Sequence, residues 1–300
     1  MTSPTPTDIP PTPTDPDGTM TTTITARPEA TPENMSTATT TPRRADKVRS
    51  INVIRSEWIK FWSIRSTSVT LIAAGLATVA FGMIFSAVAD SEEQAGPAAL
   101  LSDPVDIALG GIGLSEMIIG VLGVMFVAGE YSTGLIRTAF ASVGKRSRTI
   151  MAKVAVITAG VFTVGFTAVV ASIVLGQAVY AGSEPTVALS EVWEVVFGTT
   201  VYLTGIALIG VALGFILRST AAGIGTLVGA VFIGPNLAQL LPDSITDVFL
   251  KYLPSEAGSA MMTRVSDPDL LSRGAGYAVF AAWVVGLLVV AGVLVSRQDA

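Results

Sequence analysis

Six apolar stretches, each long enough to cross a bilayer as a helix, constrain this chain more than any other feature. A hydrocarbon core of about 30 Å is spanned by roughly 20 helical residues. Half of the residues are hydrophobic and only 14% are charged, so a soluble domain of this size would lack the polar surface to cover itself. We therefore expect an all-α membrane protein with six transmembrane helices, at residues 67–89, 108–128, 151–180, 193–217, 219–241 and 276–295.

The basic residues divide unevenly among the segments that join these stretches. Lysine and arginine concentrate in the cytoplasmic segments of membrane proteins. If the N-terminus is cytoplasmic, all but three of the 18 basic residues lie in inner segments, the exceptions being Lys251, Arg264 and Arg273. This division predicts a multi-pass protein of the cell membrane with both chain ends in the cytoplasm.

Two segments precede the six-helix domain expected at 67–300. Residues 1–42 are a Thr/Pro-rich tract with almost no apolar residues, which predicts a disordered tail because such a segment cannot offset its ordering entropy by burial. Residues 43–66 are basic, with apolar residues at helical spacing on one face. We expect an amphipathic helix in the headgroup region, with Trp58, Lys60 and Trp62 at the interface. An extension of the first span is the alternative.

The chain contains no Cys and no His. Their absence excludes disulfides, thiolate nucleophiles, Cys/His zinc sites and imidazole-based triads. The run from Gly144 to Ser147 resembles the end of a phosphate-binding loop, but Ala139 stands where that motif needs glycine and the serine follows Arg146. We expect no catalytic residue, no metal and no cofactor, and hence no enzyme.

The 129–153 segment is the longest and most basic internal loop on the inner side. Apolar residues at 135, 136, 139 and 140 predict a short amphipathic helix, and Gly129 and Gly134 permit turns before it. A short amphipathic helix held between turns is suited to serve as a docking surface for another protein. A solvated turn that carries positive-inside charge explains the same residues.

Glu116 is the clearest charge inside a predicted span. Intramembrane acids are costly and often functional, so Glu116 is a candidate proton carrier. It is equally a candidate for a neutral carboxyl that is hydrogen-bonded inside the bundle or lies near the outer interface. No Lys, Arg or second acid in another span offers it an obvious partner.

Small residues and helix breakers mark the second half of the chain. Gly225 and Gly229 form a small-xxx-small pair, which suits close packing within one bundle or between two copies. The run from Gly234 to Asn236 interrupts the fifth span, and a long outer segment at 242–274 follows it. Apolar runs there predict short helices that lie at the outer face or dip into it. They form either an extracellular gate or an ordinary interfacial loop.

Three motifs carry a resemblance to a known family. They are R-S-E-W-I-K-F-W-S-I-R-S-T at 55–67, G-E-Y-S-T-G-L-I-R-T at 129–138, and Y-L-P-S-E-A-G at 252–258. From about Val48 onward the chain resembles the permease subunit of the type-2 ATP-binding-cassette exporters, in its actinobacterial-style form. The middle motif is the most specific.

The resemblance implies a function and a set of partners. The 55–67 helix would be the connecting helix at the membrane surface. The 129–153 loop would contain the coupling helix that touches the ATPase, with Glu130, Tyr131, Gly134 and Arg137 matching the motif. A separate cassette subunit would hydrolyse ATP, and two permease copies, identical or related, would form the path. The implied partners are this ATPase, a second permease copy and membrane lipid, with no nucleic acid.

The expected function is export of an unidentified, amphipathic substrate. One departure from the family stands out, because members commonly have an uncharged residue near Glu116. Two alternatives remain open at this stage. The chain is a proton-coupled secondary transporter that uses Glu116, or it is a membrane assembly protein that transports nothing.

Overall fold

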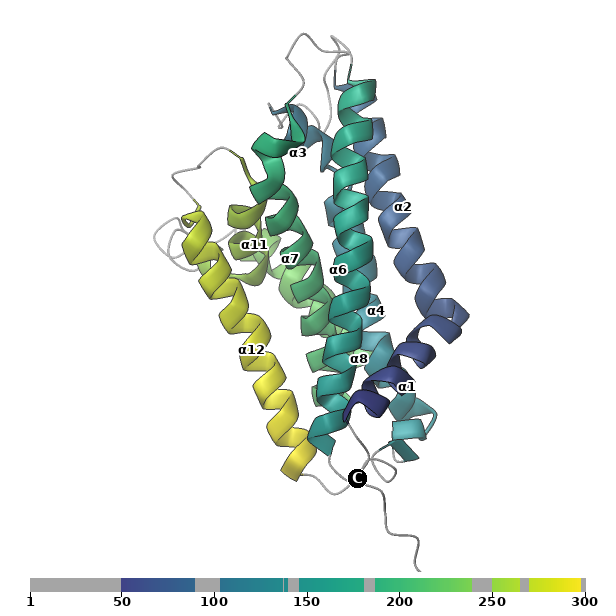
Figure 1. Ribbon diagram of the computed structural model, residues 1–300. Coiled ribbons are helices and arrows are strands. Elements are labelled where there is room, and N and C mark those ends of the chain that lie inside the picture. Colours follow the sequence, from purple (N-terminus) through teal and green to yellow (C-terminus); the bar gives the residue numbers. More distant parts are fainter. Residues whose placement is uncertain are drawn as a thin grey trace, which may run out of the picture. The chain divides into compact units, whose positions relative to one another are not determined.

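The computed structural model describes residues 50–89, 103–136, 138–139, 146–180, 187–238, 250–264 and 270–297. The elements in these ranges are all helical (Figure 1). The predicted disordered tail and the start of the 43–66 segment lie outside the described residues. The elements are α1 (Ser50–Ser63), α2 (Arg65–Val88), α3 (Pro104–Ala108), α4 (Ile112–Ser132), α6 (Arg146–Val179), α7 (Leu189–Leu217), α8 (Thr220–Val228), the π-helical turn η2 (Gly229–Ile233), α9 (Gly234–Ala238), the 3-10 turn η3 (Leu250–Tyr252), α11 (Pro254–Met262) and α12 (Arg273–Arg297).

The six predicted spans are confirmed. Helices α2, α4, α6, α7 and α12, together with the continuous run α8–η2–α9, are each long and apolar enough to cross a membrane. The second span begins at Ile112 rather than 108, because α3 is a separate helix that ends before Gly110 and Gly111. The third begins at Arg146, five residues earlier than 151. The chain thus has the helices of a multi-pass membrane protein.

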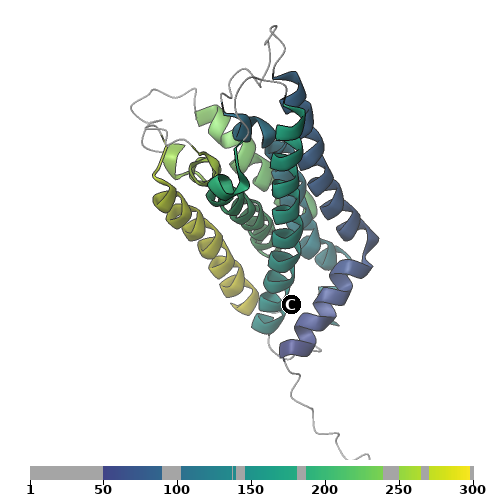
Figure 2. The same ribbon diagram turned by 45° about the horizontal axis from the view of Figure 1, so that its top comes forward.

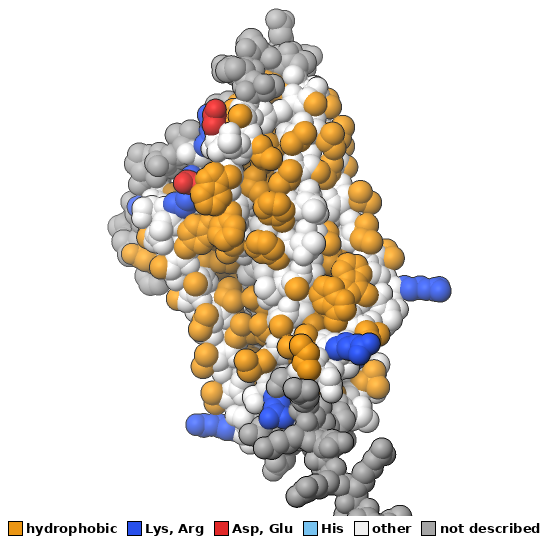
Figure 3. Space-filling model, viewed as in Figure 1, with side chains coloured by type: hydrophobic (Ala, Val, Ile, Leu, Met, Phe, Trp, Pro, Cys, Tyr) orange, Lys and Arg blue, Asp and Glu red, His pale blue; other side chains and the backbone are white. Residues whose placement is uncertain are grey.

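Helix α7 is the centre of the bundle. Of its most apolar 18 residues 78% are buried, against 22% for the corresponding part of α12. It packs against α4, α6, α11 and α12 (Figures 1 and 2). The apolar side chains on the outside of the surrounding helices are instead free to meet lipid, and Figure 3 shows hydrophobic side chains spread over one such face.

The backbones of α4 and α7 approach each other closely at glycines. A Cβ atom on Gly123 would overlap the carbonyl oxygen of Ala207, and one on Gly210 would overlap the carbonyl oxygen of Gly120. Small residues allow this proximity, and van der Waals packing then holds the helices together where lipid supplies no hydrophobic drive.

Helix α1 has one exposed apolar face and a second face that packs against the bundle. Ile51, Trp58 and Trp62 are exposed, as an interfacial helix requires, whereas Val53, Glu57 and Phe61 are buried against the bundle. The last three follow one another at intervals of four and therefore share one face. A single extended residue, Ile64, separates α1 from α2.

We predict that Gly123→Val destabilises the protein by about 1–3 kcal/mol, the usual cost of overpacking a well-packed core. The added side chain forces α4 away from Ala207. Thermal unfolding in detergent micelles measures the effect. Gly286→Val, on the exposed side of α12, is the matched control, because no atom of another described segment lies within 4 Å of the position of its Cβ. Equal losses of stability in the two variants would contradict close α4–α7 packing.

Candidate functional site

Four charged side chains form a closed ring at the end of the bundle that carries α1. The Nζ atom of Lys60 lies 3.0 Å from Oε1 of Glu57 and 2.7 Å from Oε1 of Glu130. The Nζ atom of Lys153 lies 2.8 Å from the same Glu130 oxygen and 2.9 Å from Oε2 of Glu57. The charges alternate around the ring and sum to zero, so each ammonium group contacts two carboxylates. We call Glu57, Lys60, Glu130 and Lys153 the ion ring.

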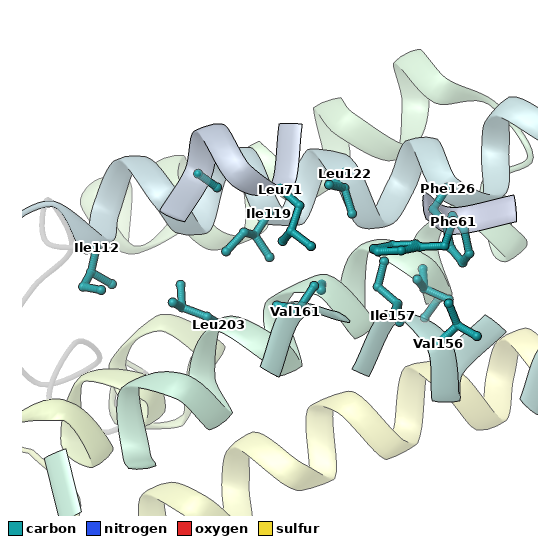
Figure 4. Packing of buried hydrophobic residues seen from close by; sticks show 14 of the residues in the cluster. Phe61, Leu71, Ile112, Ile119, Leu122, Phe126, Val156, Ile157, Val161 and Leu203 are labelled. Atoms are coloured by element: carbon teal, nitrogen blue, oxygen red, sulfur yellow. The ribbon is translucent and has the colours of Figure 1, made fainter. Parts of the chain in front are cut away.

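The ion ring is enclosed by aromatic and aliphatic side chains. Lys153 is completely buried, and its ammonium group lies 4.5 Å from the centre of the Phe126 ring. Phe61 packs edge-on against Phe126, with ring centres 5.5 Å apart, and Figure 4 shows both beside Ile157. A Cβ on Gly160 would press on the Phe61 ring, so that glycine makes room for α1. A buried ammonium group is tolerable here only because two carboxylates compensate it.

The two members on α1 have shifted pKa values. Burial alone would raise the pKa of Glu57, but the adjacent ammonium groups of Lys153 and Lys60 hold it below its usual 4.5. Burial alone would lower the pKa of Lys60, but Glu130 and Glu57 hold it above 10.5. Glu57 therefore contributes stability above pH 4.5 that is lost as pH falls through its lowered pKa. The contribution of Lys60 is lost as pH rises through its raised pKa.

The ring joins three segments that are distant in the sequence. Glu57 and Lys60 belong to α1, Glu130 to the last turn of α4, and Lys153 to the beginning of α6. Because the 129–153 loop runs from α4 to α6, the contact between Glu130 and Lys153 closes that loop at its base. The loop and α1 are thereby fixed to each other.

The structure assigns different positions to the four predicted coupling residues. Glu130 is buried in the ion ring, and its Oε2 atom has no hydrogen-bond partner within the described part of the chain. Tyr131 is half-buried, with the guanidinium of Arg218 5.3 Å from its ring centre. Gly134 is exposed and adopts a left-handed φ of 72°, as the predicted turn requires. Arg137 lies outside the described residues.

The exposed part of the loop follows these anchors. Ser132, Thr133 and Gly134 face outward, and Leu135 is 55% exposed whereas Ile136 is buried. Residues 135, 136, 138 and 139 are helical, in agreement with the predicted short amphipathic helix. Glu130 and Tyr131 thus hold the start of the loop in place, and the four residues that follow them, Ser132 to Leu135, are exposed.

Arg218 fixes Tyr131 from the turn between α7 and α8. It has a φ of 52°, the left-handed conformation that glycine adopts most easily. Its position at the end of α7 brings its side chain over the Tyr131 ring. The start of the loop therefore contacts the turn between the fourth and fifth spans as well as α1.

Glu116 has the partner that sequence reasoning did not find. Its side chain, in a residue only 9% exposed, interacts with the hydroxyl of Tyr202 on α7, which donates a hydrogen bond to the carboxyl group. The Tyr202 ring packs against Phe280 of α12, with centres 5.3 Å apart. A Cβ on Gly258 of α11 would overlap that ring. Tyr202 is thus the point at which α4, α7, α11 and α12 meet.

The predicted short helices of the 242–274 segment are present where the structure describes it, as η3 and α11. The Trp283 indole of α12 donates a hydrogen bond of 2.8 Å to the carbonyl of Tyr252. Trp283 lies ten residues into α12, or about 15 Å along its axis, so this segment dips among the spans. Arg264 forms an ion pair of 2.8 Å with Asp103, the N-cap residue of α3.

Beneath η3 lies an apolar cavity of about 590 Å³. Its walls come from α7, the α8–α9 run, η3, α11 and α12, and Thr226 contributes the one hydroxyl-bearing side chain among the lining residues. The indole N–H of Trp283 is already bonded to Tyr252. The cavity offers almost no hydrogen bonds and suits a hydrocarbon chain.

Sequence reasoning missed Glu57, Lys153 and Tyr202, although each left a signal. Glu57 lies on the same helical face as Val53 and Phe61, which is unusual for an acid that remains in water. Lys153 falls inside the predicted third span at 151–180, where a charged side chain needs a partner, although it also ends the basic 129–153 segment. Tyr202 is a polar-tipped aromatic residue in the middle of a span otherwise rich in aliphatic and small residues.

No protein-family model matches the chain, and no curated protein is significantly similar to it. Among the described residues, no group of three or more acidic, His or Cys side chains is arranged to hold a metal ion. The ion ring and the exposed part of the 129–153 loop are therefore the features of the structure that bear most directly on function.

We predict that Lys153→Met costs about 3–5 kcal/mol of stability, because it leaves two buried carboxylates to share Lys60. The double variant Glu57→Gln/Lys153→Met restores neutrality and should be more stable than that single variant. Unfolding in mixed micelles measures both, with the exposed Arg65→Met as control. A double variant less stable than Lys153→Met would mean that the ring does not hold its charges by mutual compensation.

Proposed function

We propose that this chain is the permease subunit of an ATP-driven exporter, with both chain ends in the cytoplasm and a separate cassette subunit that hydrolyses ATP. One observation carries the proposal. A loop between two spans is held at its base by the ion ring and by Arg218, and it presents an exposed apolar residue, Leu135, shortly after α4 ends. A docking site needs a fixed, partly apolar surface, whereas a simple tether does not.

The positive-inside pattern supports the orientation. The ion ring, Arg146, Arg148 and Arg218 lie at the end of the bundle that carries α1, and Arg264 and Arg273 lie at the end that carries α11. The exposed Trp58 and Trp62 of α1 are then placed to lie at the inner membrane interface. Membrane lipid is the partner of this face.

The α8 surface supports association with a second permease copy. Gly225 and Gly229 are four residues apart, and no atom of another described segment lies within 4 Å of the Cβ position of either. Among the described residues, neither glycine serves packing between helices of this bundle. A face of small residues left open in a span is suited to close contact with another helix.

The apolar cavity supports an apolar or amphipathic cargo. Ligand sites of this size, within about 300–1,000 Å³, usually carry a few polar groups that fix orientation. The cavity at Leu227, Val231 and Trp283 has almost none. A hydrocarbon tail fits this lining better than a sugar or a peptide backbone.

We predict that Leu135→Glu weakens binding of the cassette ATPase at least tenfold, equivalent to about 1.4 kcal/mol, because a carboxylate would have to be buried in the contact. A cassette ATPase encoded beside this gene would be the first candidate to co-express. Copurification at one-to-one stoichiometry and ATP hydrolysis in proteoliposomes provide the measurement.

Leu189→Glu is the matched control for that experiment. Leu189 is similarly exposed, at 43%, and opens α7 at the opposite end of the bundle. ATPase binding unaffected by Leu135→Glu, or reduced equally by both substitutions, would contradict docking at the 129–153 loop. Stable purification without an ATPase, and no such gene nearby, would oppose the proposed function itself.

Proton-coupled secondary transport is the second candidate, and burial of Glu116 favours it. The hydrogen bond from Tyr202 offers a structural role for the same carboxyl, so we predict that Glu116→Gln costs about 1 kcal/mol and leaves ATP-driven export intact. A fluorescent amphipathic dye in proteoliposomes, energised by ATP or by a pH gradient, tests this. Dye transport driven by the gradient alone and lost in Glu116→Gln would establish the proton carrier instead.

A further inference from the structure

The ion ring is a costly way to fill this part of the core. Replacing a buried ion pair with well-packed apolar residues is often neutral or stabilising by about 1–4 kcal/mol. The ring also leaves one buried carboxylate oxygen, Oε2 of Glu130, without a partner in the described part of the chain, which is unfavourable. Stability alone does not account for four charges at this position.

The ion ring instead fixes the position of α1 relative to α4 and α6. Apolar contacts tolerate sliding, whereas two ion pairs, of 2.7 Å from Lys60 to Glu130 and 2.9 Å from Lys153 to Glu57, fix one register between α1 and the ends of α4 and α6. Phe61 adds to this from one turn beyond Glu57, by packing on Phe126. The position of α1 is therefore set by the two ends of the 129–153 loop.

The connection continues from α1 into the membrane. Only Ile64 separates α1 from α2, and hydrogen bonds from the backbone N–H groups of Thr67 and Ser68 to its carbonyl bridge the break. A long flexible linker would absorb a displacement of α1, and one residue does not. Helix α2 is also a peripheral span, with 28% of its apolar stretch buried, against 61% for α4. Of the spans that reach this end, it is among the freest to tilt.

We propose that the ion ring is a clasp that makes α1 and the 129–153 loop one rigid unit, so that a displacement of the loop by the ATPase is passed through α1 to α2. The inference rests on the proposed function, and it assigns positioning roles to Glu57 and Lys60. Neither residue need touch the ATPase. The ring's two loop residues, Glu130 and Lys153, keep the loop closed while the two on α1 attach it to the moving helix.

Distances between spin labels test the clasp directly. The chain has no cysteine, so a pair introduced at the exposed Ser63 and Ser132 reports on α1 against the loop, and a pair at Ser132 and Ser296 reports on the loop against α12. In the complex with its ATPase, we expect ATP to change the second distance and leave the first unchanged. A change in the first distance would overturn the clasp without any ring variant.

The variant Glu57→Gln/Lys60→Gln detaches α1 selectively. It removes the two ion-ring charges that α1 contributes, keeps the net charge, and leaves Glu130 paired with Lys153 at the base of the loop. We expect the Ser63–Ser132 distance to broaden and to become dependent on ATP. The ATPase should remain bound, and ATP hydrolysis should continue while dye export falls at least tenfold. Arg55→Gln, an exposed change on the same helix, is the control and should leave all four readings unchanged.

The two hypotheses fail in different ways. If the ATPase binds and the detached variant keeps a narrow, ATP-independent Ser63–Ser132 distance, or exports dye normally, the clasp is wrong and the proposed function stands. If no ATPase binds the unmodified protein, the proposed function is wrong, and the clasp as a relay fails with it.

Discussion

The buried ammonium group of Lys153 is the constraint from which the arrangement of this protein follows. A cation with no exposed surface must be compensated by anions within hydrogen-bond distance, because the interior supplies no water to do so. One carboxylate comes from α4 and the other from α1. Since two carboxylates around one ammonium would leave a net negative charge, Lys60 completes a neutral ring. The requirement of one lysine thus determines where α1 docks and how the loop between α4 and α6 closes.

The opposite half of the bundle is organised by shape rather than by charge. Glycines bring the backbones of α4 and α7 together, and the space between α7, α11 and α12 is filled by Tyr202 and Phe280. Apolar packing of this kind is strong, but it contains few directional polar contacts. The helices can therefore shift relative to one another. The apolar cavity beneath η3 lies in this half. The end that carries α1 is therefore fixed by the ion ring, whereas the half that contains the cavity depends mainly on apolar packing, with the Arg264–Asp103 ion pair beside it.

Hydropathy and charge spacing predicted the six spans, because span length depends on local composition alone. The ion ring was not predictable in this way. Its members are separated by up to 96 residues, and nothing local shows that α1 lies across the ends of α4 and α6. Glu130 was expected at a partner's surface because a sequence motif records which residues matter and not which way they point. The break at Ile64 was equally hidden, since its neighbours continue the helical pattern.

The contrast between the two buried acids bears on the choice of mechanism. A proton carrier must exchange its proton with water on both sides of the membrane, which requires an open route to each. Glu116 instead meets the Tyr202 hydroxyl, and Gly258 and Phe280 enclose that ring. Glu57 and Glu130 are each paired with Lys60 and Lys153 in a neutral assembly. Both environments favour carboxyls that hold helices in position, so the driving force for the proposed transport is better sought outside this chain, at the exposed residues with which the 129–153 loop leaves α4.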